Sequence, residues 1–529
     1  MTIASDLIRE SQKDKLWSRY CGHFDLSIDE YMKIQERLLF EQFNILKDSE
    51  IGKHFYGKSA PESVQEFRER IPMTTYDDYI DLLNDRDESI LPKANYQWAH
   101  TSGRSGIQKW IPLTDRMYER YGEVALTAMI LSSAKYKGDV QVEPNDVLLL
   151  GTAPLPYTSG YVSHATADIM DVRFVPPIEE GEKMDFSDRI AAGFKMGMET
   201  GIDYFYGLAS VLGKMGERFE EGGGTGNTSL KGMKLKTIIN LMRGMLIAKS
   251  QRRNILPRDI WKLKGVMAGG TDTDIYRERV AHYWGREPLE GYASTEGGMQ
   301  SLQAWNYKGM TLFPDVDFYE FIPFEEHLKS KADPAYKPKT VLTNELVPGI
   351  YELVFTNLLG GVVMRYRIGD LITIESIGDE EIGCELPQFR FYSRADDLID
   401  LGNMIRFTEK SIWQTIEAAG IENVDWTARK EAKDGKPIFH LFIEFKPGTE
   451  VNIEDVQTRI EEKMIETHPD YAGLREVLGE NNFKVSALPS GAFDHFMESR
   501  KAEGADLAHL KPPHMQPKAD VFEKLANFG

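Results

Sequence analysis

The 529-residue chain has little cysteine, no excess of basic charge and no long apolar run. Its two cysteines, Cys21 and Cys384, lie far apart in the sequence, which argues against a disulfide framework and against a cysteine-based zinc site. No window approaches the uninterrupted apolar length of a membrane span, and the amino terminus lacks the apolar run of a signal peptide. We therefore expect a cytoplasmic protein with no membrane partner.

The charge balance limits the class of partner. Lysine and arginine number 63 against 83 aspartates and glutamates, for a formal net charge of −20. Such an acidic chain is not expected to bind nucleic acid, which needs a basic face. A local cluster of donors can still bind a small anionic ligand in an acidic protein. The length predicts two to four domains.

Hydrophobic periodicity gives the fold class. Apolar residues at three- and four-residue spacing predict helix over residues 7–55. Further along, "LKGVMAGG", "TDTDIYRERVAHYWG" and "EPLEGYASTEGG" read as strand, helix and strand. That order predicts a βαβ unit in a largely parallel sheet. Strands joined by hairpin turns follow, so we expect a mixed α/β fold.

The composition changes beyond Arg394. "WTARKEAKDGKPIFHLFIEFKP" predicts a hairpin, and "NIEDVQTRIEEKMIETH" predicts an amphipathic helix capped by Asn452. This part of the chain is therefore expected to form a small α/β domain of its own.

A loop rich in glycine and hydroxyl residues, "TSGRSGIQK", is a candidate phosphate-binding site. Its small residues let backbone N–H groups approach a polyanion, its hydroxyls donate to phosphate oxygens, and its lysine supplies a counter-charge. Taken alone, the same stretch is more typical of a surface loop, because turns of glycine and serine with a lysine are common. The residues assigned to the nucleotide are Thr101, Ser102, Gly103, Arg104, Ser105, Gly106 and Lys109.

Two further stretches carry acidic residues suited to ATP. In "GYASTEGG", Glu296 follows a predicted strand, where a carboxylate is a natural Mg²⁺ ligand, and Tyr292 is placed to pack against a purine. In "MRYRIGDLI", Asp370 can accept hydrogen bonds from both ribose hydroxyls. Taken alone, each acid is more typical of an ordinary loop or turn residue.

Together these stretches stand in a known order. A phosphate loop, then Tyr-Ala-Ser-Thr-Glu, then Tyr-Arg-x-Gly-Asp, then "YSRADDLIDLGNMI" resembles the adenylate-forming superfamily of acyl and aryl ligases. "SRADD" is similar to the joint about which these enzymes swivel a small carboxy-terminal domain. The resemblance implies a large domain over 1–393, a hinge at 394–396 and a mobile domain over 397–529. It also implies nucleotide-binding roles for Ala293, Ser294, Thr295 and Arg394.

Within the superfamily the chain most resembles the auxin-responsive Gretchen Hagen family of acyl-acid amido synthetases and their bacterial relatives. The resemblance extends to "RIPMTTYDDY", "LPQFRFYSRADD" and "GAFDHFMESRKAEGADLAHLKPPH". Lys511 falls where the family has a lysine followed by Thr-Pro-Arg, but here Pro512, Pro513 and His514 follow, so the downstream arginine is missing. Arg104 and Gln108 also depart from the superfamily's loop.

The resemblance implies an ATP-dependent ligase that uses Mg²⁺. Such an enzyme activates a small carboxylic acid as acyl-AMP and transfers the acyl group to an amino acid or another amine. Glu296 and Lys511 are the expected catalytic residues, with Lys501 and Lys518 as alternatives to Lys511. Two other functions stay open: an acyl- or aryl-CoA ligase with the CoA thiol as acceptor, and a non-catalytic nucleotide sensor.

Overall fold

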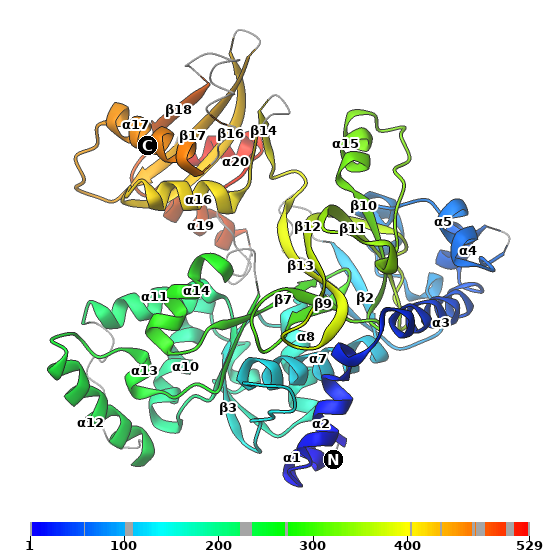
Figure 1. Ribbon diagram of the computed structural model, residues 1–529, viewed down its shortest axis with the longest axis horizontal. Helices are drawn as coiled ribbons and strands as arrows, with labels where there is room; N and C mark the ends of the chain where they lie inside the picture. The colour runs from blue at the N-terminus through cyan, green and yellow to red at the C-terminus, as the bar shows by residue number, and fades with distance from the viewer. Residues whose placement is uncertain are drawn as a thin grey trace. The chain divides into compact units, whose positions relative to one another are not determined.

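The computed structural model divides into two compact units (Figure 1). One comprises Met1–Ile368 with Ile372–Phe391, and the other Gly369–Leu371 with Tyr392–Gly529. The structure describes all residues except 1–2, 58, 101–108, 223–234, 270–272, 402–404, 434–435, 468–470, 472–481, 504–512 and 527–529. Among the described helices, none has the length and apolar character needed to cross a membrane.

An 11-stranded sheet forms the centre of the first unit. Its strands, in spatial order, are β10 (Asp317–Pro323), β11 (Gly349–Asn357), β12 (Tyr366–Asp379), β13 (Cys384–Arg394), β9 (Met310–Leu312), β8 (Gly298–Gln303), β7 (Pro288–Ser294), β6 (Gly265–Gly269), β5 (Tyr204–Gly207), β3 (Asp146–Gly151) and β4 (Val172–Val175). Strands β4, β3, β5, β6 and β7 run parallel, and β8 and β9 continue the sheet antiparallel. A separate ribbon pairs β1 (Tyr96–His100) with β2 (Trp110–Thr114).

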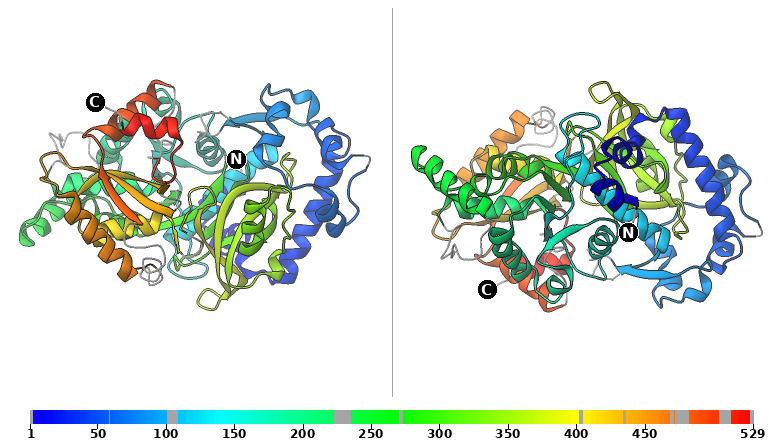
Figure 2. Two further views of the ribbon diagram at one scale, coloured as in Figure 1. Left: turned by 90° about the horizontal axis from the view of Figure 1, so that it is seen from above. Right: turned by 90° about the horizontal axis from the view of Figure 1, so that it is seen from below.

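Helices cover this sheet, and the most deeply buried of them is α7 (Asp115–Ser133), whose Val124, Leu126 and Ile130 are fully inaccessible to solvent. The amino-terminal helices α1 and α2 pack against α8 and α7 (Figures 1 and 2). The helices of this unit are α1 (Ile3–Arg9), α2 (Lys13–Tyr20), α3 (Ile28–Leu46), α4 (Glu50–Tyr56), α5 (Val64–Arg70), α6 (Ile80–Leu83), α7, α8 (Thr158–Ile169), α9 (Ile178–Gly181), α10 (Phe186–Thr200), α11 (Ala209–Glu220), α12 (Leu235–Ser250), α13 (Pro257–Ile260), α14 (Thr273–Trp284) and α15 (Phe324–Ala332).

The helix predicted over residues 7–55 is broken into α1 to α4. Ser11 has a positive φ of 54°, which ends the first piece. Ser27 and Ser49 each accept a hydrogen bond from a backbone N–H of the following helix and so act as N-caps. Three-residue periodicity continues across these caps, which is why the apolar pattern alone predicts one helix.

The predicted βαβ unit is present as β6, α14 and β7, and the two strands are parallel. Because parallel strands end at the same edge of a sheet, the chain leaves β3, β5, β6 and β7 on one side. Gly151, Gly207 and Gly269 end three of these strands, and Gly207 lies so close to the Gly151 carbonyl oxygen that a Cβ there would lie 2.5 Å from it. Glu296 follows the fourth strand at this edge.

The second unit is a small α/β structure. Its described sheet has the order β16 (Asn423–Lys433), β17 (Lys436–Phe445) and β18 (Phe483–Ala487), with a short ribbon of β14 (Ile399–Leu401) and β15 (Ile405–Phe407). The helices are α16 (Glu409–Ala418), α17 (Ile453–Thr467), α19 (Ala492–Ala502) and α20 (Ala519–Ala526). The mixed α/β fold predicted for the chain is therefore confirmed.

Two local predictions in this unit are also confirmed. β16 and β17 pair antiparallel as a hairpin, and Lys433 faces Lys436 at its end. Asn452 Oδ1 accepts hydrogen bonds from the backbone N–H groups of Glu454 (3.0 Å) and Asp455 (3.3 Å), as an N-cap does. The domain and hinge limits at residues 393 to 397 stay a prediction.

Candidate active site

The predicted magnesium ligand Glu296 sits in a tight turn between β7 and β8. Ser294 Oγ accepts a hydrogen bond from the Gly297 N–H at 2.9 Å, which closes the turn. Asn357 Nδ2 of β11 donates to the Glu296 carbonyl oxygen at 2.9 Å. The turn is therefore held by its own serine and by a strand more than sixty residues further along the chain.

The Glu296 carboxylate is oriented from two sides. The Tyr366 hydroxyl donates to Oε1 at 3.0 Å, and the ammonium of Lys109 lies 3.6 Å from the same oxygen. Glu296 is only 5% exposed. Since both contacts found among the described residues use Oε1, the second oxygen is available to a ligand.

Lys109 precedes β2 and is positioned by an aromatic ring. Its ammonium lies 5.0 Å from the centre of the Tyr76 ring, a cation–π distance. The Tyr76 hydroxyl donates to the Trp110 carbonyl oxygen at 3.2 Å and accepts from the Trp110 N–H at 2.7 Å. Burial raises the pKa of Tyr76, and the negative charge of Glu296 adds to the rise, so this phenol is neutral at neutral pH.

A buried cluster supports the turn from below. Asp317, fully buried at the start of β10, accepts from Asn357 Nδ2 at 2.9 Å and from Gln300 Nε2 at 2.8 Å. Burial raises the pKa of this carboxyl well above its usual value, while the two amide donors oppose the rise. Because Asn357 contacts both Asp317 and Glu296, the cluster fixes the position of the turn relative to β10 and β11.

The predicted phosphate loop lies between β1 and β2. Residues Thr101, Ser102, Gly103, Arg104, Ser105 and Gly106 fall outside the described residues, as does Gln108. The strands that flank the loop pair His100 with Trp110, so it begins and ends at neighbouring positions. Lys109 is the described residue of this group, and it contacts Glu296.

The other residues of the Tyr-Ala-Ser-Thr-Glu motif have structural partners. Tyr292 is buried, with its ring edge-on to Phe389 at 6.1 Å. Ala293 pairs with Met299 across the hairpin. Thr295 Oγ1 lies 3.1 Å from Thr158 Oγ1, which joins the turn to the first residue of α8. Their contacts with a nucleotide stay predictions.

The donor set at this edge is suited to one magnesium ion shared with phosphate. No group of three or more His, Cys, Asp or Glu side chains that could hold a metal occurs among the described residues. A structural zinc or calcium site would require such a group. Mg²⁺ bound with nucleotide phosphates takes only one or two protein carboxylates, and Glu296 meets this requirement.

Asp370 of β12 and Arg394 at the end of β13 lie together, in the short stretches of these two strands that belong to the second unit. Arg394 Nε is 3.2 Å from Asp370 Oδ1, and the Ala395 N–H donates to the Gly369 carbonyl oxygen at 2.8 Å. Gly369 has a φ of +79°, a conformation that favours glycine. The Gly-Asp pair and the predicted hinge segment are thus bonded to each other.

Lys511 lies outside the described residues, but His514, three residues further along, is described. His514 is buried, and its Nδ1–H and Nε2–H donate to Glu409 Oε1 at 2.5 Å and Asp425 Oδ1 at 2.6 Å. Its ring stacks on Trp426 with 4.6 Å between centres. Burial alone would lower its pKa, but the two carboxylates raise the pKa of His514 to about 10. A histidine cation therefore stands three residues after Lys511, where the family's arginine is missing.

Sequence reasoning did not identify Tyr366, Tyr76 and Asn357 as parts of the site. Tyr366 and Tyr76 do lie inside stretches that carry the resemblance, "MRYRIGD" and "RIPMTTYDDY". Asn357 had no such signal, because its contacts with Glu296 and Asp317 form only when distant strands become neighbours.

Comparison with protein families finds three matching segments. Residues 21–182 match the GH3 family N-terminal domain, residues 310–394 the GH3 family central domain, and residues 406–520 the GH3 family C-terminal domain. Together these segments cover more than half of the chain. No curated protein matches the sequence significantly.

Solved structures share the fold across nearly the whole chain. One is AtGH3.15 acyl acid amido synthetase in complex with 2,4-DB, with a TM-score of 0.63 and 15% identity over 93% of this chain and 94% of that one. Another is 2-hydroxyisobutyryl-CoA ligase in the postadenylation state with 2-HIB-AMP, with a TM-score of 0.60 and 13% identity over 94% and 92%. At these identities the likeness concerns the fold.

Proposed function

Because the chain belongs to the GH3 family, we propose that it is an ATP-dependent ligase that activates a small carboxylic acid as acyl-AMP and transfers the acyl group to an amino acid or another amine. The observation that carries the proposal is the arrangement around Glu296. A buried carboxylate with one oxygen held by Tyr366 and Lys109 lies at the carboxyl edge of a parallel sheet, the edge at which such sheets bind ligands.

The first half-reaction is an attack on phosphorus. A carboxylate oxygen of the acid attacks the α-phosphorus of ATP, the bond to the bridging oxygen breaks, and pyrophosphate leaves. Negative charge gathers on the phosphate oxygens, so cationic groups stabilise the transition state. Lys109 is one such group, and we assign Lys511 as the second. Mg²⁺, when bound at Glu296, neutralises part of the same charge.

The residues near Glu296 prepare this step before ATP arrives. Tyr366 fixes the direction of the carboxylate, and the neutral phenol of Tyr76 keeps Lys109 beside it. Lys109 and Glu296 form an ion pair with 3.6 Å between Nζ and Oε1, which is longer than a close hydrogen bond. The lysine can therefore turn to a phosphate at small cost. We assign the loop residues Thr101 to Gly106 to the same phosphates.

The nucleoside is assigned to residues further along the chain. Asp370 accepts from the ribose hydroxyls, Arg394 stays paired with Asp370, and Tyr292 packs towards the base. In the second half-reaction the amine nitrogen attacks the acyl carbonyl carbon, the bond to AMP breaks, and a proton is released with the amide. Rotation at residues 394–396 would exchange the adenylation arrangement for the transfer arrangement.

A CoA ligase is the second candidate. The fold likeness to 2-hydroxyisobutyryl-CoA ligase covers as much of the chain as the likeness to the amido synthetase. Both candidates share the adenylation step and differ only in the nucleophile that attacks acyl-AMP.

The test measures the two half-reactions separately. Acid-dependent exchange of pyrophosphate into ATP, measured with a panel of carboxylic acids, reports adenylation. Amino acids or CoA are then supplied in turn, and the amide or thioester is detected by mass spectrometry. Amide formation supports the amido synthetase, whereas thioester formation alone supports the CoA ligase. ATP binding without exchange for any acid would favour the nucleotide sensor.

A matched pair of variants ties the activity to the site. Glu296→Gln keeps the shape of the side chain but weakens a metal ligand, so exchange should fall by roughly a hundredfold or more. Glu179→Gln makes the same change on an exposed residue of α9 and should leave exchange unchanged. Near-normal exchange in Glu296→Gln would refute the assignment of the site.

A further inference from the structure

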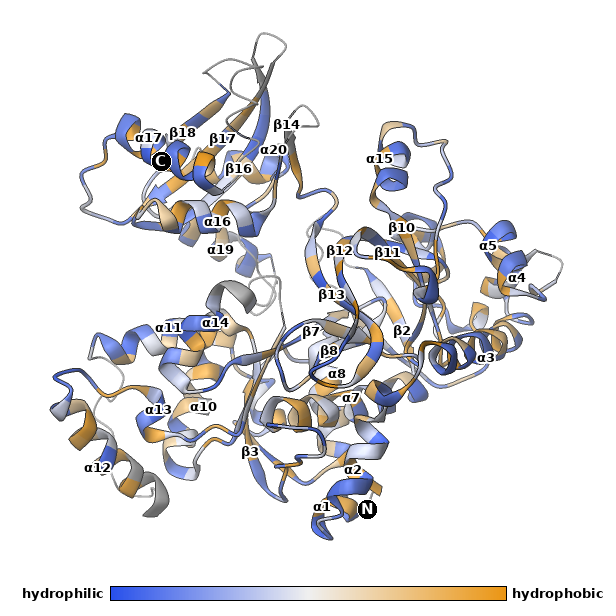
Figure 3. Ribbon diagram, in the orientation of Figure 1, coloured by the Kyte–Doolittle hydropathy of each residue, from blue (hydrophilic) through white to orange (hydrophobic). Residues whose placement is uncertain are grey.

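Helix α12 carries apolar side chains on two opposite faces. One face is buried and consists of Leu241, Gly244 and Ala248. The other is exposed: Ile239 (55%), Met242 (63%) and Leu246 (71%), with Met245 (52%) at its flank. Figure 3 shows apolar residues along this helix at the periphery of the first unit. A helix that is apolar on both faces is usually buried on both. We therefore expect another molecule to cover the exposed face of α12.

The orientation of the helix is fixed by close packing. A Cβ at Gly244 would lie 2.7 Å from Cβ of Asp259 in α13, so glycine allows the two helices to touch. The helix also packs on α10. Rotation to hide Met242 and Leu246 would expose Leu241 and Ala248 and break this contact.

The segment is also strongly basic in a chain of net charge −20. Residues 235–264 contain eight lysines and arginines and one acid, Asp259. Arg253 pairs with Asp259, and Lys264 pairs with Glu143 and Asp146. Five further basic residues of this segment form no ion pair with any residue that the structure describes: Arg243, Lys249, Arg252, Arg258 and Lys262.

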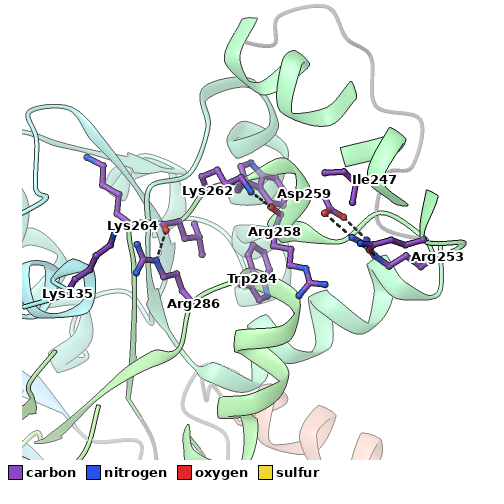
Figure 4. Close-up of a pocket in the computed structure, with 13 residues that line it drawn as sticks. Lys135, Ile247, Arg253, Arg258, Asp259, Lys262, Lys264, Trp284 and Arg286 are labelled. Carbon is purple, nitrogen blue, oxygen red and sulfur yellow. Dashed lines mark hydrogen bonds and ion pairs between the residues drawn. The ribbon is translucent and has the colours of Figure 1, made fainter. Parts of the chain in front are cut away.

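A basic cavity of about 690 Å³ adjoins the same helix (Figure 4). Ile247 of α12 and Gln251, the residue after that helix, line it, together with Arg258, Lys262 and Arg286. Arg286 precedes β7, whereas Glu296 follows it, so the cavity and the candidate active site lie at opposite ends of one seven-residue strand. Such a strand spans on the order of 20 Å, which makes the cavity separate from the site.

We propose that α12 and the basic residues that follow it form a docking surface for an anionic lipid bilayer. The exposed apolar side chains enter the boundary between headgroups and acyl chains, and the unpaired lysines and arginines meet the negative headgroups. The expectation of no membrane partner rests on the lack of a spanning segment, which has no bearing on a helix that lies in the bilayer surface. The inference is independent of the proposed function.

Charge disfavours a second copy of the chain as the occupant. A symmetric dimer places the same surface of both subunits together. Arg243 and Lys249 of one copy would then face those of the other, and like charges in contact are repulsive. An anionic bilayer is complementary to this surface both in charge and in apolar character.

The experiment is co-sedimentation of the full chain with vesicles. We expect binding to vesicles of phosphatidylcholine mixed with phosphatidylglycerol, little binding to phosphatidylcholine alone, and weaker binding as salt is raised. Leu246→Glu and Met242→Glu should abolish binding. Arg243→Glu should weaken it by roughly 25-fold, since one charge near an anionic surface is worth about fivefold and this change shifts the charge by two units.

Two control variants make the same changes elsewhere. Val347→Glu adds a charge at an apolar residue that is 60% exposed, and Lys93→Glu reverses an exposed charge. Both should bind vesicles as the unmodified chain does. Because all these residues are exposed, the variants should unfold at the same temperature as the unmodified chain.

Three outcomes would overturn the proposal. The first is that the unmodified chain fails to bind phosphatidylglycerol vesicles at low salt. The second is that Val347→Glu loses binding as completely as Leu246→Glu does. Alternatively, light scattering shows a dimer that Leu246→Glu dissociates, in which case a second copy covers this face.

Discussion

Replacement of His514 by glutamine should strongly weaken the second unit. The imidazolium ring lies between Glu409 and Asp425 and is 6% exposed, so glutamine leaves two buried carboxylates without their cation. Breaking a buried ion pair by removing one partner costs about 3–5 kcal/mol. We expect a loss of this size in the free energy of opening of the β16 region.

Hydrogen exchange measures this loss locally. The Ala428 N–H donates to the His514 carbonyl oxygen at 2.7 Å, and the Gln516 N–H donates to the Ala428 carbonyl oxygen at 2.8 Å. A loss of about 3–5 kcal/mol corresponds to a fall in protection of these amides by roughly a hundred- to several-thousandfold. As a control, Glu409→Gln and Asp425→Asn are added to His514→Gln, which removes all three charges and should restore much of the protection.

The pH dependence gives an independent check. The pKa of His514 is raised from 6.5 to about 10 in the folded chain. Its stabilising contribution is therefore fully present below pH 6.5 and is lost as the pH rises towards 10, at about 1.4 kcal/mol per pH unit. After correction for intrinsic exchange, the difference between the unmodified chain and His514→Gln should shrink over this range. A constant difference, or a triple variant as unstable as the single one, would refute the reasoning.

Three predictions concern the proposed catalytic cycle. Lys511→Ala should lower pyrophosphate exchange by roughly a hundred- to a thousandfold but leave acyl transfer from prepared acyl-AMP intact, because its charge is needed only where charge gathers on phosphorus; equal loss in both assays would contradict its role, and Lys501→Ala and Lys518→Ala test the alternatives. Asp370→Ala should raise KM for ATP by an amount equivalent to ~1–3 kcal/mol, and an unchanged KM would make it a structural residue. Tyr366→Phe removes the hydroxyl bonded to Glu296 and should lower kcat in the exchange assay by roughly tenfold; the matched change Tyr336→Phe, at an outlying residue bonded to Glu326, should leave kcat unaffected.

Local sequence patterns predicted part of this structure well. The strand, helix and strand over residues 265–294 and the cap at Asn452 depend on residues close in sequence, and the structure has both. The single helix predicted over residues 7–55 was wrong, because apolar periodicity does not register the caps at Ser27 and Ser49. Periodicity describes which face is buried, not where a helix stops.

The parts of the site that sequence reasoning missed depend on contacts between distant residues. Glu296 was predicted as a site residue from its position after a strand, but Tyr366 and Asn357 contact it across 70 and 61 residues of sequence. The missing arginine after Lys511 was visible in the sequence. That His514 is a cation there depends on Glu409 and Asp425, which precede it by 105 and 89 residues.

The assignment of Gly369–Leu371 to the second unit has a consequence for recombination between related ligases. An exchange of carboxy-terminal parts by a single crossover near residue 394 would leave Gly369 and Asp370 with one parent and Ala395 with the other. The bond from Ala395 to Gly369 and the pairing of Arg394 with Asp370 would then join residues of different ancestry. Viable chimaeras should therefore be those in which residues 369–371 and the part beyond 392 come from the same parent.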